Sequence, residues 1–188
     1  MNFVEYEKLA QVTNGKYSAE RDIQHAAYGI VTEVGELFDA YKRHLFYGTE
    51  LDLVNLMEEI GDVYWYVAIM ARALELDLAE LDNIEIEKYL DTLNVTLKVE
   101  HSLSSLICQA DTLFSIMATV SSPGELEEHL YRLVEELVCF ATVHGLQPAN
   151  CRKANIAKLQ KRYPDKFSGE AAVNRDTALE RRELEKHL

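Results

Sequence analysis

Apolar residues recur at intervals of three and four along much of this chain, which is the spacing of one face of an α-helix. In the stretch that follows Ser18, the apolar positions are Ala26, Ile30, Val34, Leu37 and Tyr41. We expect a long helix here that runs to about residue 45, with Ser18 as its N-cap. The segment Tyr47-Gly48-Thr49 interrupts the pattern and is expected to end this helix.

The same spacing predicts a second long helix at about 51–74, and the short break between the two helices predicts an antiparallel hairpin. Shorter helices are predicted at 3–13, 78–92, 102–120, 123–144 and 148–163. Ser122 and Pro123 are typical of an N-cap and a first helical position, and Gly145 is typical of a C-cap. Because only 8 Gly and 3 Pro interrupt the chain, we expect an all-α fold, a helical bundle of antiparallel hairpins.

The length of 188 residues suits one helical bundle better than several independent domains. We expect a single domain over residues 1–167, with a first half at about 1–92 and a second half at about 95–167. Residues 168–188 are highly charged, and we expect them to form a loosely attached and partly disordered tail.

The formal net charge of −13 argues against DNA or RNA as a partner, because proteins that bind these polymers present basic surface. A single nucleotide is a different case, since a divalent cation can bridge protein carboxylates and phosphate oxygens.

The three cysteines, Cys108, Cys139 and Cys151, lack the spacing of a disulfide framework or a zinc site. With no signal-like start and no run of about 18 apolar residues, a soluble cytoplasmic protein without a membrane partner is expected.

Two pairs of acidic residues lie on the apolar stripes of the two long helices. Glu33 and Glu36 belong to the first helix, whereas Glu59 and Asp62 belong to the second. Residues three apart in a helix point in the same direction, so an antiparallel hairpin can bring the two pairs together across one interface.

Carboxylates that converge in a partly dry site repel one another unless a cation compensates their charge. Ligands that offer only oxygen favour Mg²⁺, Mn²⁺ or Ca²⁺ over zinc or copper. The alternative interpretation is that the four acids are ordinary exposed charges, because the chain carries 32 Asp and Glu residues. The spacing alone leaves both interpretations open.

Three blocks of the sequence carry a more specific pattern. They are HAAYGIVTEVGELFDAYKRHLFYG at 25–48, LMEEIGDVYWYVAIMARAL at 56–74, and NIAKLQKRYPDKF at 155–167, with NRD soon after. These blocks resemble the MazG-like family of all-α nucleoside triphosphate pyrophosphohydrolases, whose signature is ExxE followed by ExxD. The resemblance covers roughly residues 1–75 and 150–176. It implies Mg²⁺-dependent cleavage of a nucleotide between its α and β phosphates, with Mn²⁺ as a substitute.

The resemblance also implies roles for individual residues. The metal ligands would be Glu33, Glu36, Glu59 and Asp62, and the nucleotide contacts would be Asn155, Lys158, Arg162, Tyr163 and Arg175. Hydrolysis needs a carboxylate that takes a proton from water, and both Glu36 and Glu58 are candidates for this base. Many relatives have a glutamate immediately before the first ExxE, where this chain has Thr32, so the number of metal ions stays open. Trp65 and Tyr66 are candidates to stack on a nucleobase, although aromatic residues at this spacing are also typical of a core.

The second half of the chain has a faint likeness to the first half. When HSLSSLICQADTLF is aligned with HAAYGIVTEVGELF, and LVEELVCFATV with LMEEIGDVYWY, three of the four acids are replaced. The replacements are Gln109 for Glu33, Thr112 for Glu36 and Cys139 for Asp62, with Glu136 matching Glu59. We interpret the second half as a degenerate copy that has lost the metal ligands and completes the bundle. An inserted hairpin with the same amphipathic spacing is the alternative.

The sequence thus leads to one main hypothesis and two others. The main hypothesis is hydrolysis of nucleoside triphosphates, ribo or deoxy, to monophosphate and pyrophosphate. The others are an all-α dUTPase, which would need a uracil-selective pocket, and a non-catalytic helical module that binds a nucleotide or a partner protein. The intact acid pairs of the first half favour catalysis, and a homodimer is possible because the family is commonly oligomeric.

Overall fold

The computed structural model describes residues 1–84, 95–119, 123–164 and 167–188, and all regular structure in these ranges is helical. The α-helices are α1 (Phe3–Val12), α2 (Ala19–Tyr47), α3 (Leu53–Ala73), α5 (Val95–Thr119), α6 (Pro123–Val143), α7 (Pro148–Arg162), α8 (Gly169–Val173) and α9 (Thr177–Leu184). Two short 3₁₀-helices, η1 (Leu78–Asn83) and η2 (Glu185–His187), complete the set. The expectation of an all-α fold is confirmed for this part of the chain.

The two long helices begin and end where local chemistry predicts. The Ser18 hydroxyl accepts a hydrogen bond from the Arg21 backbone N–H at the start of α2. Gly48 ends α2 in the left-handed conformation with φ 70°, which a residue with a side chain rarely adopts. The Asp52 carboxylate then caps α3 by accepting from the backbone N–H groups of Val54 and Asn55. Five residues, 48–52, therefore suffice to connect the two helices.

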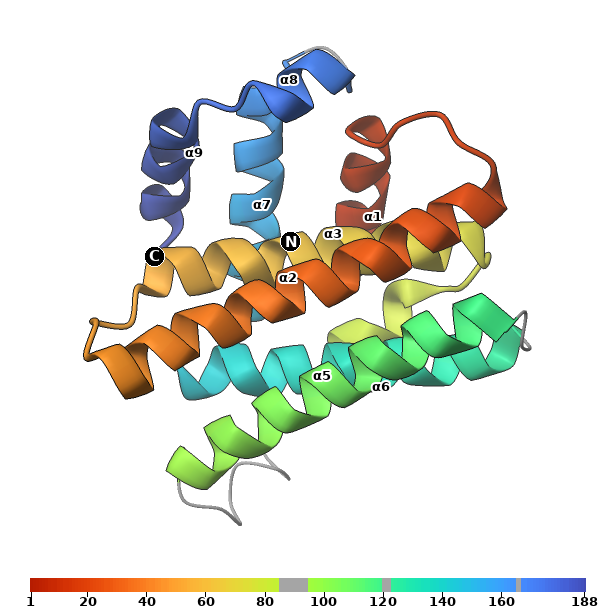
Figure 1. Ribbon diagram of the computed structural model, residues 1–188. Helices are drawn as coiled ribbons and strands as arrows, with labels where there is room; N and C mark the ends of the chain where they lie inside the picture. The colour runs from red at the N-terminus through yellow and green to blue at the C-terminus, as the bar shows by residue number, and fades with distance from the viewer. Residues whose placement is uncertain (85–94, 120–122, 165–166) are drawn as a thin grey trace.

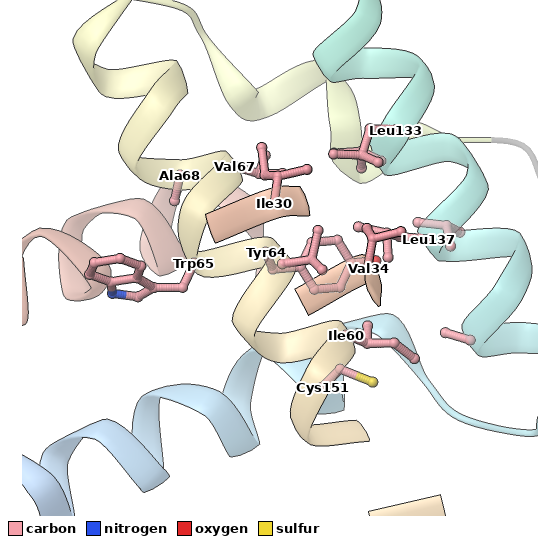
Figure 2. Packing of buried hydrophobic residues seen from close by; sticks show 14 of the residues in the cluster. Ile30, Val34, Ile60, Tyr64, Trp65, Val67, Ala68, Leu133, Leu137 and Cys151 are labelled. Atoms are coloured by element: carbon pink, nitrogen blue, oxygen red, sulfur yellow. The ribbon is translucent and has the colours of Figure 1, made fainter. Parts of the chain in front are cut away.

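Helices α2 and α3 lie side by side through the middle of the molecule (Figure 1). Helices α5 and α6 pack on one side of this pair, and α1, α7 and α9 lie on the other side (Figure 1). The core forms where these layers meet: Figure 2 shows Ile30 and Val34 of α2 with Tyr64 of α3 and Leu133 and Leu137 of α6. The acidic half of the predicted site therefore comes from the central pair of helices.

Two predicted segments differ from the structure. In place of a helix at 78–92 there is the short η1, capped by the side chain of Asp77, while residues 85–94 lie outside the described ranges. Helix α5 begins at Val95, earlier than the predicted residue 102. The predicted cap at Ser122 also lies outside the described residues, although α6 does begin at Pro123.

The expectation of a loosely attached C-terminal tail is wrong. Residues 169–173 and 177–184 form α8 and α9, and α9 packs against α7. The side chains of Glu180 and Leu184 are buried there. High charge misled the prediction because Glu180 is paired with arginines of the bundle and is not exposed to solvent.

None of the helices in the described part of the chain combines the length and the apolar composition that a membrane crossing requires.

Candidate functional site

Three of the four predicted metal ligands come together between α2 and α3. Glu33 of α2 and Glu59 and Asp62 of α3 each offer a carboxylate oxygen, and these oxygens lie within 4.8 Å of one another. The three-residue spacing of Glu59 and Asp62 aims both side chains the same way, and the packing of α2 on α3 brings in Glu33. In this acid cluster, Glu59 is only 5% exposed, whereas Glu33 and Asp62 are half-buried and, like Glu59, line a cavity.

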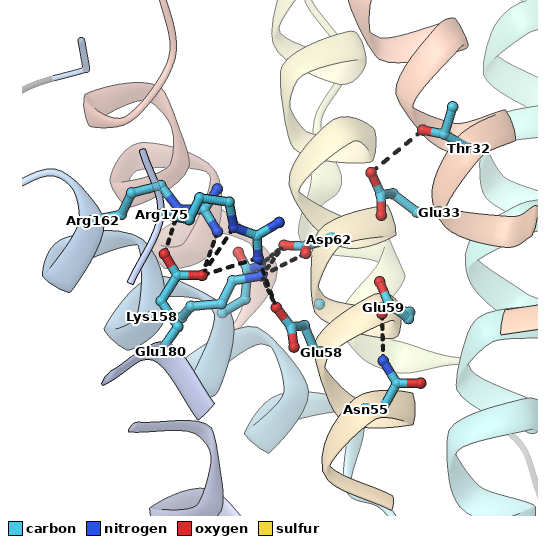
Figure 3. A network of polar contacts seen from close by, with 12 residues as sticks. Thr32, Glu33, Asn55, Glu58, Glu59, Asp62, Lys158, Arg162, Arg175 and Glu180 are labelled. Carbon is cyan, nitrogen blue, oxygen red and sulfur yellow. Dashed lines mark hydrogen bonds and ion pairs between the residues drawn. The ribbon is translucent and has the colours of Figure 1, made fainter. Parts of the chain in front are cut away.

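The electrostatics of the acid cluster favour a bound cation. Burial, followed by the charges of Asp62 and Glu36, raises the pKa of Glu59 to about 9. Burial, followed by the same two neighbours, raises the pKa of Glu33 to about 7. Hydrogen bonds to Glu59 from the Asn55 amide, at 2.6 Å, and to Glu33 from the Thr32 hydroxyl, at 3.4 Å, do not offset this repulsion (Figure 3). A set of ligands that offers only carboxylate oxygens suits Mg²⁺ or Mn²⁺, so these residues fit the ion that the resemblance implies.

Glu36, the fourth predicted ligand, is not part of this close group. Its side chain is exposed, although it lines the same cavity as Glu33 and Glu59 and contributes to their raised pKa values. The structure therefore places Glu36 at the rim of the acid cluster. This position allows contact with both water and a bound substrate.

Asn155 and Lys158 of α7 hold Asp62 in place. The Asn155 amide donates to Asp62 Oδ1 at 2.6 Å and accepts from the Tyr6 hydroxyl at 2.8 Å, which fixes its orientation. Lys158 Nζ lies 2.7 Å from Asp62 Oδ1 and 2.5 Å from Oδ2, and it also donates to Glu58 at 3.2 Å. Lys158 is fully buried and does not line the cavity. Both residues, predicted as nucleotide contacts, are instead bonded to acids within the protein.

Arg162 and Arg175 do line the cavity, but both are already paired (Figure 3). Arg162 donates from Nε and Nη2 to the two carboxylate oxygens of Glu180, at 2.7 Å each. Arg175 donates to Glu180 and to Glu58. Glu180 was not predicted, because its partner Arg162 lies in another helix and no motif includes Glu180. Glu58, considered only as a base, turns out to be an acceptor for Lys158 and Arg175.

The acid cluster lines a cavity of about 510 Å³ that also has a wall of aromatic side chains. The aromatic and histidine side chains that line it are Tyr17, His25, Trp65, Tyr66, Tyr163 and Phe167. The ring of His25 stands edge-on to Trp65 and Tyr66, with centroids 5.8 and 5.3 Å apart. The Trp65 indole N–H donates to the Thr13 hydroxyl at 2.9 Å, so this wall is fixed in orientation. Thr13 and Tyr17 line the cavity without having been predicted.

The corresponding positions of the second half hold no such cluster. Gln109 is hydrogen-bonded to His129 at 2.7 Å, and the Thr112 hydroxyl donates to the Cys108 carbonyl at 2.7 Å. Cys139 is buried, and Glu136 is half-buried, with a pKa raised by burial. Among the described residues, the group Glu33, Glu59 and Asp62 is the one set of acids, histidines or cysteines whose ligand atoms approach closely enough for an ion.

Comparison with known proteins gives no further guide, since no family model, no curated protein and no solved structure matches this chain. The family resemblance of the three sequence blocks stays a prediction.

Proposed function

We propose that this chain hydrolyses nucleoside triphosphates to monophosphate and pyrophosphate with Mg²⁺, as a MazG-like enzyme. One observation carries the proposal: a single cavity combines three clustered carboxylates, two arginines and an aromatic wall. A nucleotide has matching parts, because its phosphates need cations and donors while its base offers a face for stacking.

The balance of charge in the site supports a divalent ion. The cations Lys158, Arg162 and Arg175 are matched by the carboxylates Asp62, Glu58 and Glu180. Glu33, Glu36 and Glu59 are left without a cationic partner among the described residues. When bound, Mg²⁺ would neutralise these carboxylates together with the phosphate oxygens and stabilise the charge that develops during hydrolysis.

The residues around the proposed ion would have two roles, binding the ion and orienting its ligands. Glu33, Glu59 and Asp62 hold the ion, while Asn155 and Lys158 keep the Asp62 carboxylate in one orientation. This supporting role replaces the direct nucleotide contact that the resemblance implied for Asn155 and Lys158.

Glu36 is the better candidate for the base. Glu58 is already engaged by hydrogen bonds from Lys158 and Arg175, whereas Glu36 makes no ion pair within the described ranges and is free to contact a water molecule. Glu36 would take a proton from the water that attacks a phosphorus atom. As that P–O bond forms, the bond to the bridging oxygen of the leaving pyrophosphate breaks.

The aromatic wall would receive the nucleoside. Trp65 is 9% exposed and fixed by Thr13, whereas Tyr17 is 53% exposed at the mouth of the cavity. A base received by this wall would be held mainly by stacking, which discriminates weakly among bases. We therefore propose a broad preference in place of the uracil selectivity of a dUTPase.

We further propose that α2 and α3 form one antiparallel hairpin and that α5 and α6 are its degenerate copy. The replacement of three acids by Gln109, Thr112 and Cys139 supports this interpretation. So does the layered arrangement in which α5 and α6 pack on α2 and α3.

The test is release of pyrophosphate from each common NTP and dNTP and from dUTP, with Mg²⁺, with Mn²⁺ and with a chelator. We expect monophosphate and pyrophosphate with either metal and no product with the chelator. Glu59→Ala and Asp62→Ala should abolish turnover while helical content stays near that of the wild type. Wild-type turnover in either variant would remove the metal assignment, turnover of dUTP alone would favour a dUTPase, and no turnover at all would favour a non-catalytic module.

A further inference from the structure

Glu180 of α9 joins the two arginines of the cavity, although no sequence motif includes it (Figure 3). Its side chain is 3% exposed. Arg162 donates to both of its oxygens from Nε and Nη2, at 2.7 Å each, which is a bidentate ion pair. Arg175 donates to the same carboxylate from Nε at 3.2 Å and from Nη2 at 3.0 Å. Burial would raise the pKa of Glu180, but the hydrogen bonds from these arginines keep it below its usual value.

Arg162 and Arg175 differ in how deeply they are buried and in how short their contacts are. Arg162 is 13% exposed and has the shorter contacts, whereas Arg175 is 39% exposed and has contacts of 3.0 to 3.2 Å. Arg175 also shares its Nη2 with Glu58, at 3.2 Å. Arg162 is therefore the anchored cation, and Arg175 is the cation with access to whatever enters the cavity.

Helix α9 is fixed to the bundle independently of Glu180. Arg181 donates to the Asp52 carboxylate, which caps α3, at 2.7 Å, and the Leu184 side chain is fully buried. The position of the Glu180 carboxylate is thus set by packing on α3 and α7, and the arginines adapt to it.

We propose that Glu180 is a positioning residue for binding of the phosphate chain, an inference that rests on the proposed function. It keeps Arg162 and Arg175 together on the cavity wall against their mutual repulsion. It also prevents them from turning fully onto the acids of α3, which would cover the place of the metal ion. When a substrate binds, Arg175 exchanges Glu58 for a phosphate oxygen while Glu180 keeps hold of both guanidinium groups.

The test compares wild type with Glu180→Gln by calorimetric titration with Mg²⁺-pyrophosphate, a ligand that consists of phosphate groups alone. We expect Kd to rise on the order of ten-fold or more, because loss of a charge-assisted hydrogen bond costs roughly that factor. In turnover, KM should rise more than kcat falls. Glu180→Asp retains the charge and should recover part of the affinity. Glu183→Gln makes the same change on the same helix, at a residue paired with Lys186, and should bind like the wild type.

The outcomes separate this proposal from the proposed function. Wild-type affinity in Glu180→Gln, or a wild type that does not bind Mg²⁺-pyrophosphate, overturns the positioning role. If Glu180→Gln does not fold, Arg175→Gln at a 39% exposed side chain takes its place, with the same expected loss and the same overturning result. Binding of pyrophosphate that depends on Glu180, without any turnover of triphosphates, supports the positioning role and removes the proposed function. Turnover of triphosphates that is unchanged in Glu180→Gln supports the proposed function and overturns the positioning role.

Discussion

Burial and the neighbouring carboxylates destabilise the ionised form of Glu59 unless a cation or a proton neutralises its charge. Its pKa of about 9 and that of Glu33, about 7, both exceed the ordinary value of 4.5 for a glutamate. The folded protein therefore holds protons that the unfolded chain releases as pH rises past about 4.5. Stability that depends on these protons is present at low pH and is lost as pH rises through about 7 and about 9.

Without metal, the free energy of unfolding should thus fall between about pH 5 and about pH 9, by at most about 1.4 kcal/mol per pH unit for each group. Glu59→Gln should flatten this dependence, and Mg²⁺ should stabilise the wild type much more than the variant. Denaturant titrations at several pH values, with Mg²⁺ and with a chelator, measure both effects. Glu50→Gln, at an exposed glutamate, serves as the control. A pH profile of Glu59→Gln that matches the wild type would contradict the assignment of a protonated Glu59.

Lys158 is a buried cation that forms ion pairs with Asp62 and Glu58. Burial alone would lower its pKa, but the charges of Asp62 and Glu58 raise it above the usual value. Lys158→Met keeps the volume and removes the charge, and we expect a loss of about 3–5 kcal/mol, the usual effect of breaking a buried ion pair. Lys153→Met, at an exposed position of the same helix, should change stability little; an equal loss in both variants would contradict a specific role of Lys158.

The acid cluster could be predicted from the sequence. The hydrogen bonds and ion pairs that surround it could not. Regular helical spacing places Glu59 and Asp62 on one face, so their meeting with Glu33 follows once the two helices pack. Lys158 contacts Asp62, 96 residues away, and Arg175 contacts Glu58, 117 residues away, and no local pattern encodes such pairs.

Helices α3 and α7 approach each other closely beside the acid cluster. A Cβ atom added to Gly61 would lie 2.8 Å from the Asn155 Cβ and 3.2 Å from the Cys151 carbonyl oxygen. Glycine at this position therefore allows α7 to approach α3 closely enough for Asn155 to reach Asp62. Apolar periodicity predicted both helices but could not predict this approach, which depends on a residue without a side chain.

Gly61→Ala should therefore push α7 away, with a loss of about 1–3 kcal/mol in the free energy of unfolding, as expected for overpacking. Its affinity for Mg²⁺ should also fall, because Asn155 orients Asp62. Gly35→Ala is the matched control, since nothing lies within 4 Å of its added Cβ. In a helix interior that change should stabilise by about 0.5–1 kcal/mol. Equal effects of the two variants in denaturant titration would contradict the close-packing argument.

If α5 and α6 are a degenerate copy, as proposed, their role is structural. Glu136→Gln should leave kcat and the Mg²⁺ requirement near wild-type values, because its neighbouring positions have lost their carboxylates. Steady-state kinetics of Glu136→Gln beside Glu59→Gln give the comparison. A large loss of kcat in Glu136→Gln would show that the second half is not degenerate.

For the whole molecule, the proposed function predicts that Mg²⁺ is required for binding of a triphosphate as well as for its turnover. With a net charge of −13 and uncompensated acids in the cavity, a free triphosphate meets repulsion at long and short range. A non-hydrolysable triphosphate analogue should therefore bind with Mg²⁺ and show no measurable affinity in a chelator. Calorimetric titration tests this, and equal affinity in both conditions would contradict a metal-bridged site.

The contact between Lys158 and Asp62 also sets the order in which the site can mature during synthesis. Asp62 leaves the ribosome 96 residues before the lysine that neutralises it. Until then, the acids of α2 and α3 lack this buried counter-charge, and closing their interface would bury uncompensated carboxylates. The proposed metal site can therefore be complete only after α7 has been synthesised and has packed on α3.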